Sequence, residues 1–483
     1  MGGIWSREQS DEQPGVVPDE TPVNGNKRAI DEEPTTTAEQ TVKRKKTTKE
    51  RRAHFRNNNS WKATEEAKKN DAPAVSTPRL AKRKVALLIG FSGTGFQGMQ
   101  INPGVRTIES VLFEAMCKAG VISQANSEDP KKVQWMRAAR TDKGVHAAGN
   151  VVSLKMGIPE DESDVVPRIN SFLPEQIRVW GYVPTIRSFH AKTGCDSRVY
   201  EYLLPTYAFM PPSPKELKEA PTSETDLKLM GNSSDVIRYI SRSTDEEMAK
   251  KEAYRIDTND LTKFREALKM FEGTHNFHNY TIGRGYNDRS SNRYIMSINV
   301  GDPIYINDTE WLSVKLHGQS FMLHQIRKMI SMALLVVRTK TPLSLIERSF
   351  GSERINIPKA PALGLLLERP VFDAYNRRAV SKKDNKFRDA IDFDKYKDTI
   401  DAFKQEWIYS KIFAAEKEER GFDTFLLSVD SHFGPDYKYL NAEGTIPEEA
   451  IITTKYTVKK DKSTVKTNEE QDELEQDAEE EDA

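Results

Sequence analysis

Apolar and polar positions follow regular periods along residues 81–378, and these periods predict strands and helices. Val85–Phe91 is a β-rich apolar run that ends in glycines, which is typical of a buried strand. Ile108, Leu112 and Met116 recur at helical spacing, and Gly120 follows as a helix stop. The same criteria predict further strands over 135–139, 150–156, 177–183, 198–204, 293–300 and 310–316, and further helices over 165–172, 261–271 and 320–338.

These elements fall into two stretches that each mix strands with packed helices, residues 80–205 and 256–378. They predict an α+β body with two similar lobes. Residues 206–255 open with three prolines and continue Ser- and charge-rich, which predicts an insertion or linker. The flanks are polar. They are predicted to be a disordered N-terminal tail (1–79), a helical C-terminal extension (379–445) and a disordered acidic tail (446–483).

The net charge of −1 conceals a basic body and an acidic tail. Residues 81–380 hold 41 Lys and Arg against 33 Asp and Glu, whereas residues 469–483 hold ten acidic side chains and no basic one. A basic body favours a polyanionic partner such as nucleic acid. The N-terminal tail carries a basic cluster at Lys43–Arg52, which indicates a nuclear address, a loose contact with nucleic acid or a solvated charge run.

The composition also excludes several classes of protein. Two cysteines, Cys117 and Cys195, are too few for a disulfide scaffold or a four-cysteine zinc site. Met329–Val337 is the longest largely apolar stretch, and it is too short to cross a bilayer. The histidines His146, His190 and His275 lack metal-ligand spacing, so we expect hydrogen-bonded scaffold residues and no metal.

Gly93–Gly98 fits the G-x-G-x-x-G pattern of dinucleotide-binding folds and follows a strand. Such folds need a helix to begin inside the motif, so that its N-terminus meets the pyrophosphate. Here helical periodicity starts only at Ile108. We therefore expect a loop whose glycines let another backbone, or an RNA phosphate, approach closely.

The densest polar cluster, Arg137–His146, joins two predicted strands and should be a loop on a rigid scaffold. Asp142 within it has two interpretations, since it could merely cap a turn. The neighbouring Arg140 favours a chemical role, because an arginine keeps a nearby carboxylate ionised, as a nucleophile must be.

Several segments resemble the TruA family of tRNA pseudouridine synthases, above all Arg140-Thr-Asp-Lys-Gly-Val-His146, which resembles the catalytic signature of that family. The matching segments follow the family order over residues 84–372, roughly 60% of the chain. Phe321–Met329 and Ile357–Leu367 are most similar to the eukaryotic nuclear branch. The other matching segments are 84–100, 188–191, 198–202, 273–277, 318–327 and 360–365.

The resemblance implies conversion of uridine to pseudouridine at several positions in tRNA, with small nuclear RNA and mRNA as further candidate substrates. It assigns catalysis to Asp142 and substrate binding to four residues, with no cofactor and no metal. Those four residues are Arg140, Tyr200, Arg327 and Leu365. In the family, the tyrosine stacks on the target uracil, the first arginine helps to fill the space that the base vacates, the second pairs with the aspartate, and the leucine lines the pocket.

The resemblance also implies that the lobes share a central antiparallel sheet, with helices on one face, an RNA-binding cleft on the other and a helical C-terminal extension. We expect a monomer in the nucleus, with no membrane association. Two alternatives remain open. One is a non-catalytic RNA-binding protein on the same fold, and the other is a nucleotide-dependent oxidoreductase that uses the Gly93–Gly98 loop.

Overall fold

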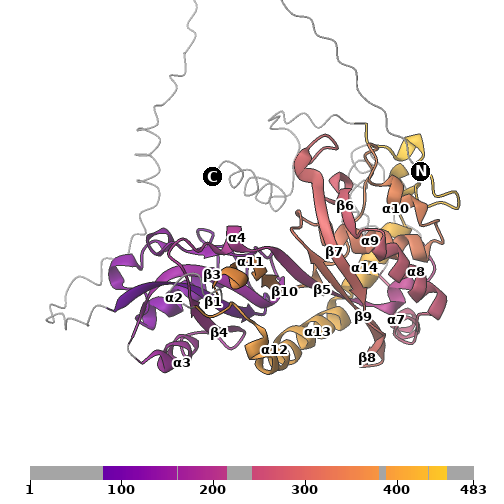
Figure 1. Cartoon of the computed structure of the whole chain (residues 1–483). Coiled ribbons are helices and arrows are strands. Elements are labelled where there is room, and N and C mark those ends of the chain that lie inside the picture. Colours follow the sequence, from indigo (N-terminus) through magenta and orange to yellow (C-terminus); the bar gives the residue numbers. More distant parts are fainter. Residues whose placement is uncertain (1–79, 160, 215–241, 380–387, 433, 454–483) are drawn as a thin grey trace, which may run out of the picture. The chain divides into compact units, whose positions relative to one another are not determined.

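The computed structural model describes residues 80–159, 161–214, 242–379, 388–432 and 434–453 (Figure 1). All of the described residues belong to one compact unit that begins at Pro78. The predicted N-terminal tail with its basic cluster, the centre of the predicted insertion and most of the predicted acidic tail lie outside these ranges.

Ten strands of the described chain join in a single sheet, in the order β4-β1-β3-β10-β5-β9-β7-β6, while β2 pairs with β3 and β8 with β9. The α+β class is therefore confirmed, and the strands of both halves of the chain share one sheet. The strands are β1 (Ala81–Phe91), β2 (Met136–Arg137), β3 (His146–Ile158), β4 (Ile177–Pro184), β5 (Ser197–Pro205), β6 (Gly273–Asn276), β7 (Asn292–Val300), β8 (Ile304–Ile306), β9 (Thr309–Gly318) and β10 (Leu365–Val371).

Strand β10 lies near the middle of the sheet, where the two halves meet (Figure 1). It pairs antiparallel with β5 and parallel with β3. The prediction was an antiparallel sheet, and the pairing of β10 with β3 is an exception to it. The apolar pattern did not predict β10, because its run of leucines ends quickly at Glu368, Arg369 and Pro370. Its position places Leu365 directly opposite Tyr202 of β5.

Helices pack around this sheet, and none in the described part of the chain is long and apolar enough to cross a membrane. The helix predicted over 320–338 begins only at Gln325, because His324 has a left-handed backbone with φ of 60°. The helices are α2 (Ile108–Lys118), α3 (Val165–Asn170), α4 (Ala191–Gly194), α7 (Asp245–Glu252), α8 (Thr258–Lys269), α9 (Gln325–Arg338), α10 (Ser344–Arg348), α11 (Asp373–Ala379), α12 (Lys397–Phe403), the π-helical turn η10 (Lys404–Tyr409), α13 (Ser410–Glu419) and α14 (Gly421–Asp430).

Strand β1 is buried on both faces. Successive side chains of a strand point to opposite faces. Val85, Leu87 and Ile89 pack in a core with α2 and α3, whereas Ala86 and Leu88 belong to a second core that includes α12. Helices therefore cover both faces of this part of the sheet, whereas the prediction placed them on one face only. The helices on the second face belong to the C-terminal extension. There Phe403 of α12 contacts Trp180 of β4, with ring centroids 5.2 Å apart.

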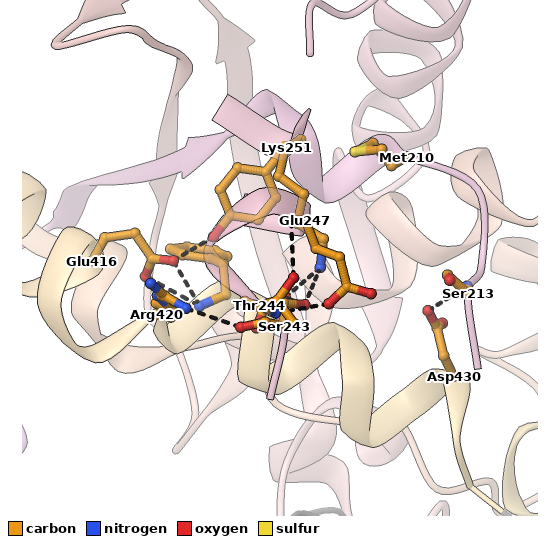
Figure 2. Close-up of polar contacts among 12 residues, drawn as sticks. Met210, Ser213, Ser243, Thr244, Glu247, Lys251, Glu416, Arg420 and Asp430 are labelled. Carbon is orange, nitrogen blue, oxygen red and sulfur yellow. Dashed lines mark hydrogen bonds and ion pairs between the residues drawn. The ribbon is translucent and has the colours of Figure 1, made fainter. Parts of the chain in front are cut away.

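The described ends of the predicted insertion 206–255 are both held by α14 (Figure 2). The Ser213 N–H donates to Asp430 Oδ2 at 2.9 Å, and Ser243 Oγ donates to Asp423 Oδ1 at 2.8 Å. Lys251 of α7 forms an ion pair with the fully buried Asp423. The C-terminal extension thus holds the chain at Ser213 and again at Ser243.

Candidate active site

The five site residues predicted from the sequence line one cavity of about 720 Å³. Arg140 and Asp142 lie in the loop between β2 and β3, Tyr200 lies on β5, and Arg327 lies on α9. Leu365 opens β10, next to β5. The structure therefore collects residues that are up to 225 positions apart in the sequence.

The loop that carries Asp142 is held by the glycine-rich loop after β1. Met99 of the glycine-rich loop donates its N–H to the Thr141 carbonyl at 3.1 Å. Within the Asp142 loop itself, the Val145 N–H donates to the Asp142 carbonyl at 3.1 Å. A Cβ built on Gly98 would lie 3.0 Å from the Thr141 carbonyl oxygen, and one on Gly93 would lie 2.2 Å from the Val145 oxygen. The expectation that these glycines admit another backbone is confirmed, and α2 begins at Ile108, beyond the G-x-G-x-x-G pattern.

We expect Gly93→Ala to destabilise the fold and to displace the loop that carries Asp142. The added methyl group has backbone on the opposing side, which cannot rotate away, and overpacking of this kind typically costs about 1–3 kcal/mol. The midpoint temperature of thermal unfolding and the expected RNA-modifying activity should both fall. Gly285→Ala is the matched control, because a Cβ at that position meets nothing within 4 Å. Equal behaviour of the two variants would contradict the close-approach explanation.

His146, at the start of β3, supports the same glycine loop. Its Nδ1 accepts a hydrogen bond from the Gly93 N–H at 3.2 Å and lies 3.2 Å from Ser92 Oγ. Because the backbone N–H can only donate, Nδ1 is the unprotonated nitrogen. Burial lowers the pKa of His146 to about 4. His146 is therefore a neutral scaffold residue, as the sequence predicted.

This lowered pKa predicts a pH-dependent loss of stability. Between pH 6.5 and about 4 the unfolded state binds the His146 proton more readily than the folded state, so stability falls as the pH falls, by about 3 kcal/mol at most. Burial raises the pKa of the Glu416 carboxyl to about 7, and that group acts in the opposite direction. Urea unfolding of wild type and His146→Gln at pH 7 and pH 5 separates the two effects. The variant should lose less stability than wild type between pH 7 and pH 5. An equal loss of stability in the two proteins would exclude His146 as the cause.

A hydrogen-bond network around Glu109 also supports the Asp142 loop, and it was not predicted from the sequence. Glu109 of α2 is fully buried, and its carboxylate accepts hydrogen bonds from Trp135 Nε1 at 2.8 Å and from Arg137 Nε and Nη2 at 2.7 and 2.8 Å. Arg137 also donates to Gln100 Oε1 at 3.1 Å. This network fixes the strand that leads into the Asp142 loop. The sequence signal that could have predicted this network is the acidic Glu109 on an otherwise apolar helix face.

Tyr200 and Leu365 contribute to the cavity from adjacent strands. Burial, countered by Arg198 and assisted by Asp142, raises the pKa of Tyr200 to about 12, so the phenol is neutral at physiological pH. The Tyr200 ring stands nearly perpendicular to that of Phe321, with centroids 5.3 Å apart and an interplanar angle of 82°. Phe321 belongs to residues 320–324, which were predicted to be helical but precede α9 and line the cavity.

Arg327 is positioned by the first turn of α9 and donates from Nε to the Ala360 carbonyl at 2.6 Å. It lines the same cavity as Asp142, and their pairing stays a prediction. The charged side chains that line the described cavity are six cations and one acid, Asp142. The cations are Arg137, Arg140, Lys143, Lys192, Arg198 and Arg327. Within the described residues, no three His, Cys, Asp or Glu side chains group as a metal site.

Comparison with known proteins identifies the family to which the chain belongs. The model of the family described as tRNA pseudouridine synthase matches residues 267–373. The chain is 46% identical over 445 residues to tRNA pseudouridine synthase 1 of Yarrowia lipolytica, covering 82% of this chain and 83% of that protein. It is 41% identical to the protein of the same name from Saccharomyces cerevisiae, covering 75% and 74% of the two chains. It is also 36% identical to the mouse pseudouridylate synthase 1 homolog, covering 77% and 80%.

The chain therefore belongs to the tRNA pseudouridine synthase family. The predicted family is confirmed, and with it the predicted class of enzyme, an RNA pseudouridine synthase. A chain of the solved Cbf5-Nop10-Gar1 complex aligns with 71% of this chain at 10% identity and a TM-score of 0.18, which is too low a likeness to support any argument.

Proposed function

We propose that this chain isomerises uridine to pseudouridine at several positions in tRNA, with Asp142 as the nucleophile and without a cofactor. The observation that carries the proposal is the wall of the cavity, where one carboxylate stands among six cations in the described residues. Cationic side chains attract an RNA phosphate backbone, and a carboxylate can act as a covalent catalyst without a metal.

The reaction requires only rearrangement of the substrate. The bond between uracil N1 and ribose C1′ breaks, the base rotates, and C1′ bonds to C5. N1 gains a proton and C5 loses one, so the reaction needs no oxidant or reductant. A base inside a helix cannot reach Asp142, so it must first leave its stack. The cavity, at about 720 Å³, lies within the range of about 300–1,000 Å³ that is usual for ligand pockets.

The other site residues then have distinct roles in the proposed reaction. Tyr200 offers a neutral aromatic ring on which the displaced uracil stacks. Arg140 helps to fill the space that the base leaves in the RNA. Arg327 pairs with Asp142, and Leu365 supplies an apolar wall beside Tyr200.

A direct test is to incubate the full chain with a pool of unmodified tRNA transcripts and no added cofactor, and to separate the nucleosides after digestion. We expect a pseudouridine peak that grows with time while uridine declines by the same amount. Salt-sensitive tRNA binding without any pseudouridine would instead favour the non-catalytic RNA-binding alternative.

We also propose small nuclear RNA and mRNA as further substrates, and action as a monomer in the nucleus. The basic body supports further RNA substrates, and the cluster at Lys43–Arg52 supports a nuclear address. The proposal of a monomer rests on the resemblance of the C-terminal helical extension to the eukaryotic branch of the family. Nuclear enrichment of a fluorescent fusion that disappears when Lys43–Lys46 are replaced by alanine is the expected result. Unchanged distribution would contradict the assigned role of the cluster.

A further inference from the structure

Phe321 and Tyr200 form a perpendicular ring pair in the cavity wall. Their centroids are 5.3 Å apart, and both rings are half-buried. Tyr200 comes from β5, whereas Phe321 comes from residues 320–324, between β9 and α9. The pair therefore joins two segments more than 100 positions apart in the sequence at the surface where the proposed function places the uracil.

The place of the Phe321 ring is set by a glycine. Gly318 pairs with Arg198 at the end of β9, two positions along β5 from Tyr200. A Cβ on Gly318 would lie 2.8 Å from Cζ of the Phe321 ring, and real Cβ atoms essentially never come that close. The absence of a side chain at this position thus lets the phenyl ring fold back over the end of β9.

The backbone around Phe321 is fixed on both sides. Arg198 Nη1 donates to the Gln319 carbonyl at 3.2 Å. The Met322 N–H donates to Gln325 Oε1 at 2.8 Å, and Thr281 Oγ1 donates to the Leu323 carbonyl at 3.0 Å. These bonds hold the backbone on both sides of Phe321, so its ring projects toward Tyr200 from an anchored segment.

We propose that Phe321 is a positioning residue for pyrimidine recognition, which acts by fixing the orientation of the Tyr200 ring. An aromatic side chain has a broad rotational preference about its last torsion, and a perpendicular neighbour restricts that rotation through a favourable edge-to-face contact. Stacking of a uracil on Tyr200 requires one defined ring plane. The inference rests on the proposed function, because it assigns the uracil to Tyr200.

The effect should appear in turnover more than in RNA affinity. Phosphate contacts provide most of the affinity for RNA and do not depend on the Tyr200 ring. We expect Phe321→Leu to lower kcat about 2- to 10-fold, which corresponds to the loss of one aromatic pair, while KM for tRNA changes less than about 2-fold. Gly318→Ala keeps the phenyl ring but displaces it, and it should lower kcat in the same direction.

The experiment is a double-mutant cycle in single-turnover assays with excess enzyme. Phe321→Leu should slow pseudouridine formation by the same factor in wild type and in Tyr200→Phe, which keeps the ring, and should have no further effect in Tyr200→Leu. Phe350→Leu is the matched control, since Phe350 stacks on His275 at 4.3 Å and does not line the cavity. That variant should lose stability but retain kcat.

A second measurement does not depend on activity. In protein labelled with 3-fluorotyrosine, the fluorine signal that disappears in Tyr200→Phe belongs to Tyr200. Phe321→Leu should shift that signal, and Phe350→Leu should leave it in place. An unmoved Tyr200 signal, or an equal slowing by Phe321→Leu in the Tyr200→Leu background, overturns the inference. Complete inactivity of the wild type would instead contradict the proposed function and leave the fluorine result to decide the ring contact.

Discussion

Asp142→Asn is expected to lower the rate of pseudouridine formation at least about 10³-fold, because the amide cannot serve as the nucleophile. The substitution is nearly isosteric, and the loop around it is held by backbone bonds that it does not touch, such as Met99 N–H to the Thr141 carbonyl. The cavity cations remain in place as well. We therefore expect folding and tRNA binding to be preserved while catalysis is lost.

The measurement is the yield of pseudouridine from a tRNA transcript with enzyme in excess, together with the Kd for the same tRNA. Asp302→Asn is the matched control, because that side chain is 93% exposed and Asp302 is not among the residues that line the described cavity. The control should retain full activity. Asp142→Asn with more than about a tenth of the wild-type rate would remove Asp142 from its assigned role.

Lys404→Met should reduce the free energy of unfolding by about 3–5 kcal/mol, which is the expected cost of leaving buried charges unpaired. Lys404 is 5% exposed. Its Nζ lies 3.1 Å from Glu201 Oε2 and 2.7 Å from Glu368 Oε2. Burial alone would lower the pKa of Lys404, but the two carboxylates raise it well above its ordinary range. The methionine would pack in a similar volume and leave both carboxylates without their cation.

These carboxylates belong to the two central strands of the sheet, β5 and β10, so the extension joins the strands that carry Tyr200 and Leu365. Tyr409 reinforces the network by donating to Glu201 Oε2 at 2.7 Å. Lys397→Met is the matched control, since Lys397 is an exposed lysine that pairs with Asp401 at the surface. Exposed pairs typically contribute about 0–1 kcal/mol.

Chemical unfolding of both variants measures the difference. A midpoint for Lys404→Met close to that of Lys397→Met would show that the buried network does not stabilise the sheet. A large loss restored by Lys404→Arg would support the charge explanation over a packing one.

The local pattern was sufficient for elements whose signal lies within one segment. The apolar run at Val85–Phe91 predicted β1, and the polar cluster around Asp142 predicted a loop on a rigid scaffold. The five site residues were identified through their resemblance to family segments, and the structure gathers all of them in one cavity. Their individual roles stay predictions.

The remaining features depend on contacts between distant segments, which no local pattern encodes. Strand β10 was missed because its leucines form too short a run, yet it fills the centre of the sheet. The Lys404–Glu201 pair spans 203 positions, and neither residue has a local signature. The left-handed backbone of His324 delays the start of the predicted helix to Gln325, so Phe321 lies outside the helix and lines the cavity, although the apolar residues around it fit helical spacing.

Tritium release from tRNA transcribed with 5-tritiated uridine tests the central claim most directly, because pseudouridine formation displaces the hydrogen on C5. Wild type and Asp142→Asn should be assayed side by side on a pooled set of tRNAs, with no cofactor added. The account predicts release by wild type and none by the variant, with equal tRNA binding by both. Equal release by the two proteins would contradict the role of Asp142, and no release by either, with binding intact, would contradict uridine isomerisation itself.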